Sequence, residues 1–524
     1  MLYKREACEW DLQSISLWQL RLPVQVLETL DATNEQATFG HSKDNIARSL
    51  HEVMVRQTRH VTATERSPRV TDTYGMSSLI RKLTMSKSDL FHPFKRAGVA
   101  IALASLGLVT SIAAFAADRF VPAPPEAGTS IPQQQVKFGM RPFADNTFYV
   151  IAMQKGWFKD VGIGIDPAPE GLKVNDTNAT ALLLNGQVDV ISENCPNMLP
   201  TYKSARTLKC VGFTDNFLGN AILANPRLHL KSFKDYIAQG MSFDAALHAA
   251  LAPLEGKTLV GPPQVTDRPF EILASSMSKV NWNLQVLDDS KSVVLARAGR
   301  EDFVNPDGAP IVYSLEQAGW TDILDVGDMN KYAPAGAGSP VEHLVTVVGV
   351  GANGNFVNSH PNAILRFMSV VWRTLDAVKK DPSLFALQAP YLNSVAGTSL
   401  NAKDVQNAVD RLDPFSTYDY NATYFTDEKN VYFYKNAWSA IIDDIATSGI
   451  IGKGSVTPED IVWAAPIWQQ MKDYQTRTDA LLKTLDGASL PADKANLLKQ
   501  AHQYYTWFDF LDAYRFANAA SGKA

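Results

Sequence analysis

An uncharged apolar segment, Ala97–Ala116, divides this chain into a part that cannot belong to a folded domain and a part that can. The basic pair Lys95-Arg96 precedes it, and it ends in the small-x-small pattern Ala114-Phe115-Ala116. A charged segment, an apolar run and such a site, in this order, are typical of a secretory signal peptide. We therefore predict a cleaved signal peptide over Met85–Ala116. The alternative is a retained membrane anchor, because about 20 apolar residues can cross a bilayer.

Residues 1–84 are polar and show no persistent helical or strand period. We expect an unstructured leader there and assign it no fold. Two readings stay open: translation starts at Met85, or the leader is a cytoplasmic region in front of an anchor. Residues 117–135 are rich in Pro and Gln and predict an extended linker.

The composition excludes several classes of protein. The net charge is −5, and no cluster of Lys and Arg follows the apolar segment, so nucleic-acid binding is not expected. The cysteines beyond the leader, Cys195 and Cys210, lack the spacing of a metal site. Whether they pair stays open. We expect no metal and no cofactor, since phosphate-loop, nucleophile-elbow and zinc-protease motifs are also missing from the sequence.

From Val136 onward, short apolar strands alternate with helices of about ten residues, which indicates βαβ units and a mainly parallel sheet. Gly156 and Gly186 end the first helices, and Ala309–Tyr313 reads as a further strand. His343–Gly351 reads as a buried strand that returns to the first set of units. After it the chain is helical, with an apolar stripe between Ile364 and Val378.

Several motifs resemble one family. They are KGWFKDVGI at Lys155–Ile163, LNGQVD at Leu184–Asp189, LEGKT at Leu254–Thr258 and a helix NSHPNAILRFM starting at Asn358. In this order they resemble the periplasmic solute-binding proteins of ABC importers, in the class that carries nitrate, sulfonates, taurine and thiamine-pyrimidine precursors. The resemblance covers about residues 136–385 and weakens after 390.

The resemblance implies an α/β, two-lobe, periplasmic-binding-protein-like (type II) fold with mixed, mainly parallel sheets flanked by helices. Lobe I would comprise residues 136–225 and about 341–430, and lobe II residues 226–340. Residues 431–524 would form a helical C-terminal region.

Ligands of open α/β sheets bind beyond the carboxyl ends of the strands. This rule selects polar and aromatic residues that follow the expected strands; some of them could instead cap helices or pack in the core. In the first lobe they are Arg141, Phe143, Asp145, Asn146, Thr147, Phe148, Glu193, Asn194, Asp215 and Asn216. In the second lobe they are Gln264, Thr266, Asp267 and Tyr313.

The charge of the ligand depends on which of these side chains point inward. Inward carboxylates at Asp145, Glu193 and Asp215 would require a ligand with an amine or a polarised ring N–H. Inward guanidinium groups of Arg141 and Arg268 would favour a sulfonate or carboxylate. We favour an organic, nitrogen-containing or partly aromatic solute.

The expected function is a monomeric, soluble periplasmic protein that captures a small molecule between its lobes and delivers it to an ABC permease in the inner membrane. No catalysis is expected. A membrane-anchored sensor domain is one alternative. An enzyme on the same fold is another, with Cys195 as the candidate nucleophile.

Overall fold

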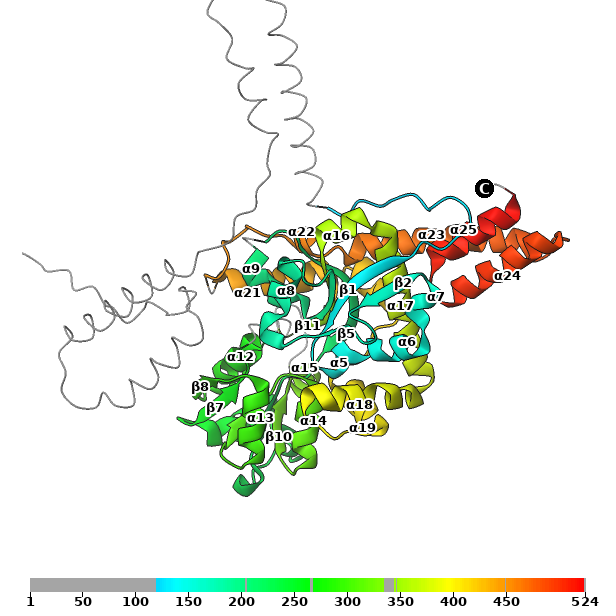
Figure 1. Ribbon diagram of the computed structural model, residues 1–524. Helices are drawn as coiled ribbons and strands as arrows, with labels where there is room; N and C mark the ends of the chain where they lie inside the picture. Colours follow the sequence, from blue (N-terminus) through cyan, green and yellow to red (C-terminus); the bar gives the residue numbers. More distant parts are fainter. Residues whose placement is uncertain are drawn as a thin grey trace, which may run out of the picture. The chain divides into compact units, whose positions relative to one another are not determined.

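The computed structural model describes residues 119–202, 205–263, 267–333, 344, 346–447 and 449–522, without the side chains of residues 176, 289 and 290. The expected leader and signal peptide lie outside these ranges. Within them, no helix is both long enough and apolar enough to cross a membrane. The chain forms two α/β lobes and a set of C-terminal helices (Figure 1).

The sheet of lobe I has the strand order β2-β1-β4-β11-β5, and β3 also pairs with β1. Strands β2, β3 and β4 run parallel to β1, whereas β11 runs antiparallel to both β4 and β5. The strands are β1 (Gln134–Met140), β2 (Ile163–Asp166), β3 (Leu172–Lys173), β4 (Val190–Glu193), β5 (Leu208–Phe217) and β11 (Thr346–Asn353). The helices are α5 (Ala144–Thr147), α6 (Tyr149–Lys155), α7 (Trp157–Asp160), α8 (Ala179–Leu184), α9 (Leu199–Tyr202), α16 (Gly354–Ser359) and α17 (Pro361–Lys380), with 3₁₀ turns η4 (Asp176–Asn178) and η5 (Cys195–Met198).

Lobe II is built on a second mixed sheet, of order β10-β6-β9-β7-β8, in which β6 is antiparallel to both of its neighbours. Its strands are β6 (Ala221–Ala224), β7 (Thr258–Gly261), β8 (Asn283–Val286), β9 (Phe303–Val304) and β10 (Thr321–Asp325). Its helices are α10 (Phe233–Ala238), α11 (Phe243–Leu251), α12 (Arg268–Ser278), α13 (Asp289–Arg297), α14 (Ala309–Gln317) and α15 (Val326–Tyr332), with 3₁₀ turns η6 (Pro226–Leu228) and η7 (Ala252–Leu254). The predicted fold class, with its mixed sheets and flanking helices, is confirmed.

One predicted element is wrong. Ala309–Tyr313 is the first part of helix α14 and not a strand. Its apolar residues Ile311, Val312 and Leu315 are spaced as on one helical face and are buried against lobe II. Pro310 lies in the first turn, where proline is well tolerated because the N–H that it lacks has no intrahelical partner there. A short apolar run cannot distinguish a buried strand from a buried helix by periodicity alone.

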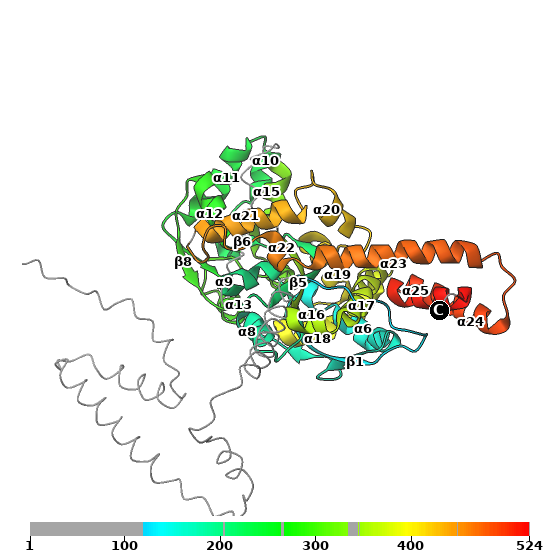
Figure 2. The ribbon, with the colours of Figure 1, turned by 90° about the horizontal axis from the view of Figure 1, so that it is seen from above.

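The last part of the chain is helical, as expected. It contains η9 (Pro382–Leu384), α18 (Phe385–Ala396), α19 (Ala402–Leu412), α20 (Asn421–Thr426), α21 (Tyr434–Thr447), α22 (Pro458–Ile461), α23 (Ala464–Leu485), α24 (Ala492–Thr506) and α25 (Phe510–Ser521). Helices α23, α24 and α25 pack on one another at the C-terminal end (Figure 2).

The C-terminal region also covers the β5 edge of the lobe I sheet. Strand β5 ends that sheet, and Val462 forms a parallel bridge with Cys210 at its edge. The backbone N–H of Trp463 donates to the carbonyl of Cys210 at 2.8 Å. The buried ammonium of Lys209 donates to the carbonyl of Asp460 at 2.6 Å. An unpaired sheet edge can pair with other chains, and these contacts remove that possibility here.

A buried ion-pair network fastens the linker and the last helix to lobe I. The guanidinium of Arg366 on α17 donates to Asp512 on α25, with Nε to Oδ2 at 2.7 Å. It also donates to both carboxylate oxygens of Glu126 at 2.9 Å. Arg515 donates to the backbone carbonyls of Glu126, Gly128 and Ser130. Replacing one partner of such a network leaves buried charge uncompensated.

We expect Arg366→Met to lower the free energy of unfolding by about 3–5 kcal/mol, because Glu126 would lose its bidentate partner and the buried Asp512 would keep only Arg515. The measurement is urea denaturation of the full chain. Lys380→Met is the matched control. Its exposed pair with Asp376, at 2.7 Å, should contribute less than about 1 kcal/mol. Equal effects of the two changes would contradict a stabilising role of the network.

Candidate functional site

Arg141 joins the two lobes at the carboxyl ends of their strands. It follows β1, and its backbone N–H donates to Ser192 Oγ of β4 at 3.1 Å. Its guanidinium lies 3.2 Å from Glu193 Oε1 of lobe I and 3.8 Å from Asp307 Oδ2 of lobe II. The side chain is 2% exposed, and its charge lies 4.8 Å from the centre of the Phe143 ring. The two carboxyl groups thus share one buried cation.

Helix α5 places Asp145, Asn146 and Thr147 in the interior. The Asn146 Nδ2 group donates to the Asp145 carboxylate, and the Thr147 hydroxyl donates to the carbonyl of Phe143 at 2.9 Å. The side-chain amide of Gln388 on α18 donates to Thr147 Oγ1, also at 2.9 Å. The N-cap position of α5 is Phe143, without a side-chain capping bond, so these polar groups are not used as caps.

Two other predicted residues of lobe I lie within packed side chains. Phe148 is fully buried, stacks on Tyr149 with ring centres 4.1 Å apart, and meets the edge of Phe415. Asn216 uses both ends of its amide, because it donates to the Tyr420 hydroxyl and accepts from the Tyr424 hydroxyl.

Strand β5 and the segment after α19 bring Asp215 and Asp413 to one face. The N–H of Leu218 donates to the carbonyl of Leu412 at 2.7 Å, and Asp215 forms an antiparallel bridge with Phe415. This register sets Asp413 opposite Phe217. Because side chains alternate between faces along paired strands, Asp413 and Asp215 point to the same side. Both carboxyl groups are 0% exposed.

Lobe II contributes buried polar residues from α12 and from the turn after β9. Asp267 is the N-cap residue of α12, without a side-chain capping bond, and it is fully buried. Arg268 pairs with Glu271 and donates to the carbonyl of Pro262. The Asn305 amide donates to Glu271 Oε1 at 2.9 Å. Arg268 is therefore held within its own lobe.

The remaining predicted residues of lobe II are not part of this group. Gln264 and Thr266 lie outside the described residues. Tyr313 lies on α14, where its hydroxyl accepts from Asn407 of α19 at 3.2 Å.

In lobe I, the predicted residue Asn194 is buried. It follows β4 and is the N-cap residue of η5.

Burial dominates the electrostatics of the site. It raises the pKa of Glu193 to about 7, although the Arg141 cation acts in the opposite direction. Burial likewise raises the pKa of Asp307 to about 6 and that of Asp145 above its usual range. Asp215 and Asp413 have pKa values well above the ordinary range, through burial and then through neighbouring aspartates. Without a ligand, the site therefore retains protons that exposed carboxyl groups would lose.

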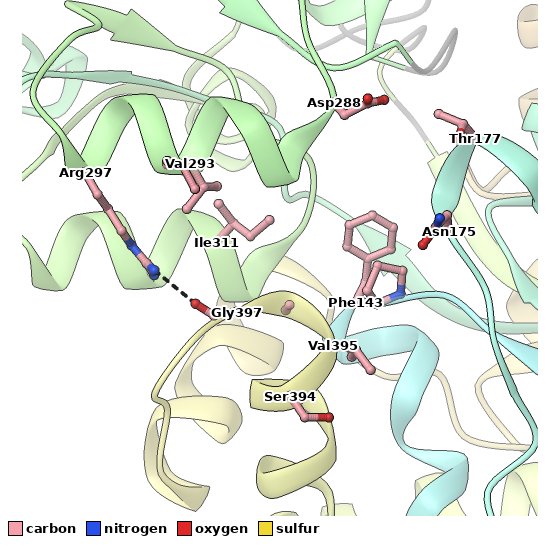
Figure 3. A pocket seen from close by; sticks show the side chains of 13 residues that line it. Phe143, Asn175, Thr177, Asp288, Val293, Arg297, Ile311, Ser394, Val395 and Gly397 are labelled. Atoms are coloured by element: carbon pink, nitrogen blue, oxygen red, sulfur yellow. Dashed lines mark hydrogen bonds between the residues drawn. The ribbon is translucent and has the colours of Figure 1, made fainter. Parts of the chain in front are cut away.

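An open cavity of about 410 Å³ is lined by residues of both lobes, and Phe143 is the residue selected from the sequence that reaches it. Phe143 and Asn175 line it from lobe I, and Val293 and Ile311 line it from lobe II (Figure 3). Arg297 closes one side by donating to the carbonyl of Gly397 at 3.0 Å. Phe143 therefore touches both the cavity and the buried Arg141.

Helices α18 and α19 hold the two lobes together at this point. Helix α18 packs on α6 of lobe I, and α19 packs on α14 of lobe II (Figure 1). Arg411 of α19 pairs with Glu316 of α14 at 2.7 Å, and Gln317 donates to Asp404 at 3.0 Å.

Asp307 and Asp413 were not among the residues selected from the sequence. Asp307 follows the two-residue strand β9 in the turn Asn305-Pro306-Asp307-Gly308, so the rule of carboxyl ends could have found it. That strand was missed because it is so short. Asp413 belongs to a part of the chain beyond the resemblance, and no motif marks it.

The two cysteines are buried and free. Strand β11 lies between β4 and β5, near which Cys195 and Cys210 lie. The Cys210 thiol helps to raise the pKa of Cys195. Burial is the larger cause of that rise, which keeps the thiol protonated. Within the described part of the chain, no group of His, Cys, Asp and Glu is placed to hold a metal ion.

No protein-family model matches this chain, and no curated protein matches it. Among solved structures, it is similar to the periplasmic nitrate-binding protein NrtA from Synechocystis PCC 6803, with 13% identity and a TM-score of 0.45 over 66% of this chain and 89% of that one. It is also similar to the aliphatic sulphonate binding protein SsuA from Escherichia coli, with 14% identity and a TM-score of 0.42 over 63% and 92% of the two chains.

A third similar structure is the alkanesulfonate-binding protein SsuA from Xanthomonas axonopodis pv. citri bound to MOPS. It has 14% identity and a TM-score of 0.39, over 56% of this chain and 87% of that one. These proteins are of the class that the sequence motifs resemble. At such TM-scores the likeness does not define the fold, which follows from the strand orders given above.

We expect the stability of the ligand-free protein to fall as the pH rises from 5 to 8. The folded state keeps the Glu193 proton up to a pKa of about 7, whereas the unfolded chain releases it near 4.5. Between these values the folded state binds more protons, so rising pH favours unfolding. Glu193→Gln should reduce the fall by roughly 1–3 kcal/mol in urea titrations at each pH. Asp302→Asn, on the surface, is the control. Stability that stays constant or rises over this range would contradict the interpretation.

We expect Gly308→Ala to weaken the contact between the lobes at Phe143. Gly308 has φ +90°, and an added Cβ would lie 2.5 Å from Cδ1 of Phe143. Gly299→Ala is the matched control, because its φ is +67° and its Cβ would meet open space. The first change should cost about 1–2 kcal/mol more than the second in thermal or urea melts. In a Phe143→Ala background the difference should shrink; an unchanged difference would exclude this contact as its cause.

Proposed function

We propose that this protein is a soluble, periplasmic substrate-binding protein that captures a small organic solute between its lobes and delivers it to an ABC importer. The observation that carries the proposal is the meeting of buried polar side chains from both lobes at the carboxyl ends of their strands. Arg141 with Asp307 is the clearest case. A site assembled from two lobes exists only when they close, so a bound solute favours closure.

The buried charge of this site supports a binding role. Polar groups buried without full compensation cost free energy, and a fold retains them where a ligand supplies the missing partners. Asp215 Oδ2 and both oxygens of Asp413 have no hydrogen-bond partner within the described structure. A solute that contacts them would recover part of the desolvation cost on binding.

The chemistry of the site argues for binding rather than catalysis. Cys195 was the candidate nucleophile, but a nucleophilic cysteine must be a thiolate that substrate can reach. Its thiol is 0% exposed, and burial raises its pKa well above the ordinary value. We therefore propose that the bound solute leaves the cleft unchanged.

A binding screen on the full chain, expressed in a Gram-negative host and purified from the periplasmic fraction, tests this function. Sulfonates, nitrate, amines, pyrimidines and aromatic acids are added singly. At least one should bind with one molecule per chain in calorimetry and raise the melting temperature, because a ligand of the folded state stabilises it by mass action. The compound should be recovered intact by mass spectrometry.

N-terminal sequencing of the same material should give a first residue near Ala117. Failure of every compound to bind, or chemical conversion of the bound compound, would overturn the binding function. Recovery of the chain only from the inner membrane would favour the anchored sensor instead.

A further inference from the structure

Three buried aspartates form what we call the acidic cluster: Asp145, Asp215 and Asp413. They come from α5, from β5 and from the segment after α19, and each is at most 4% exposed. Asp215 Oδ1 accepts the Thr214 hydroxyl at 2.7 Å, while its Oδ2 atom has no partner. Neither oxygen of Asp413 has a partner among the described residues. The cluster therefore presents hydrogen-bond acceptors that the protein leaves unused.

Neutral side chains at the same place point to the same kind of ligand. The amide of Asn146 is 1% exposed, and its Nδ2 group bonds to Asp145 while Oδ1 has no partner. The hydroxyl of Tyr149 is equally buried and also lacks a partner within the described ranges. Burial raises the pKa of Tyr149, and the charges of Asp215 and Asp145 raise it further. The hydroxyl therefore lies close enough to the acidic cluster to interact with it electrostatically.

The two arginines that were expected to favour an anion, Arg141 and Arg268, form ion pairs with carboxyl groups outside the acidic cluster. Arg141 faces Glu193 and Asp307, so two carboxyl groups already compete for its charge. Arg268 is held by Glu271 and by a backbone carbonyl. Arg141 acts on Asp145 as well, but burial outweighs that effect. A sulfonate at the cluster would add negative charge to groups that already repel one another.

We propose that the captured solute is an organic cation with N–H donors, a primary ammonium or an amidinium, bound by Asp145, Asp215 and Asp413 with Asn146. This inference rests on the proposed binding function and names its solute class. A cation with N–H groups supplies both the charge and the donors that the open oxygens require. A quaternary ammonium supplies only charge and would leave these acceptors unsatisfied.

Binding of such a cation should release protons. Burial and the neighbouring aspartates raise the pKa values of Asp215 and Asp413 well above the ordinary range, and a neighbouring cation acts in the opposite direction because it favours the charged form. The charged or titratable groups that act on the cluster come from the turn after β1, from α6 and α20, and from the turn after β9. They are Arg141, Tyr149, Tyr424 and Asp307.

A four-carbon series tests the charge and the donors separately. Calorimetry on the full chain at pH 7.5 compares 1,4-diaminobutane and butylamine with butanol, butanesulfonate and butyltrimethylammonium. The amines should bind at least about tenfold more tightly than the other three, and their binding should release protons, detected as a dependence of the heat on buffer ionisation enthalpy. Butanamidine serves as the amidinium probe of the same carbon number.

Asp413→Asn removes one charge with little change of shape. It should weaken amine binding about 10- to 100-fold while raising the melting temperature of the ligand-free protein at pH 8, since it removes a buried repulsion. A merely structural role would lower both. Asp302→Asn, in an exposed pair with Arg227, should leave amine affinity unchanged.

Tighter binding of butanesulfonate or of any other anion than of the amines would overturn the solute class while leaving the binding function intact. So would equal binding of butylamine and butyltrimethylammonium. If no amine binds while another class of compound in the wider screen does, the proposed solute class is also overturned. Only a failure of every compound in both screens to bind would count against the binding function itself.

Discussion

A single buried guanidinium links the two lobes of this protein at the carboxyl ends of their strands. Arg141 extends from the end of β1, lies beside Glu193 at the end of β4, and reaches Asp307 in the other lobe. Taking these charges out of water is costly, and the cost is offset only when the geometry brings them together. Because the partners belong to different lobes, the contact requires that the lobes lie against each other at this point. Phe143, whose ring lies 4.8 Å from the guanidinium, packs against Gly308 of lobe II at the same place.

The same interaction influences the charge of the candidate site. Arg141 divides its positive charge between two carboxyl groups, so little of it compensates the aspartates of α5, β5 and the segment after α19. Burial then keeps the pKa values of these aspartates high in the absence of a ligand. In the binding function that we propose, a cation would offset part of this desolvation cost, and its binding would be coupled to proton release.

The C-terminal helices have a structural role in this scheme. They cover the edge of β5 through Val462 and Trp463, and their network around Arg366 fastens the linker to lobe I. Helix α19 reaches across to α14, and the segment that follows it supplies Asp413. The part of the chain that least resembles a known family therefore contributes a residue to the candidate site. The family motifs therefore predict the two lobes better than they predict the residues of the candidate site.

Much of the fold follows from local sequence. Gly156 ends α6 in the left-handed conformation, as expected from its place after an apolar helix. The stripe along α17 faces the core of lobe I. Prediction failed at Ala309–Tyr313, because a short apolar run fits a strand and a helix equally well until its neighbours are known. It also passed over β9, which is too short to leave a periodic signal and is defined by its pairing with β6 and β7.

The sequence by itself determined the alternation of strands and helices, the α/β class and the rule that polar residues after strands would gather at one edge. It could not decide which charges face one another, because that depends on contacts between residues far apart in the chain. Only the tertiary structure paired Arg141 with Asp307 and set Asp413 beside Asp215. The reason is physical: periodicity and capping are local properties, whereas the pKa of a buried carboxyl group depends on every charge and dipole that folding brings near it.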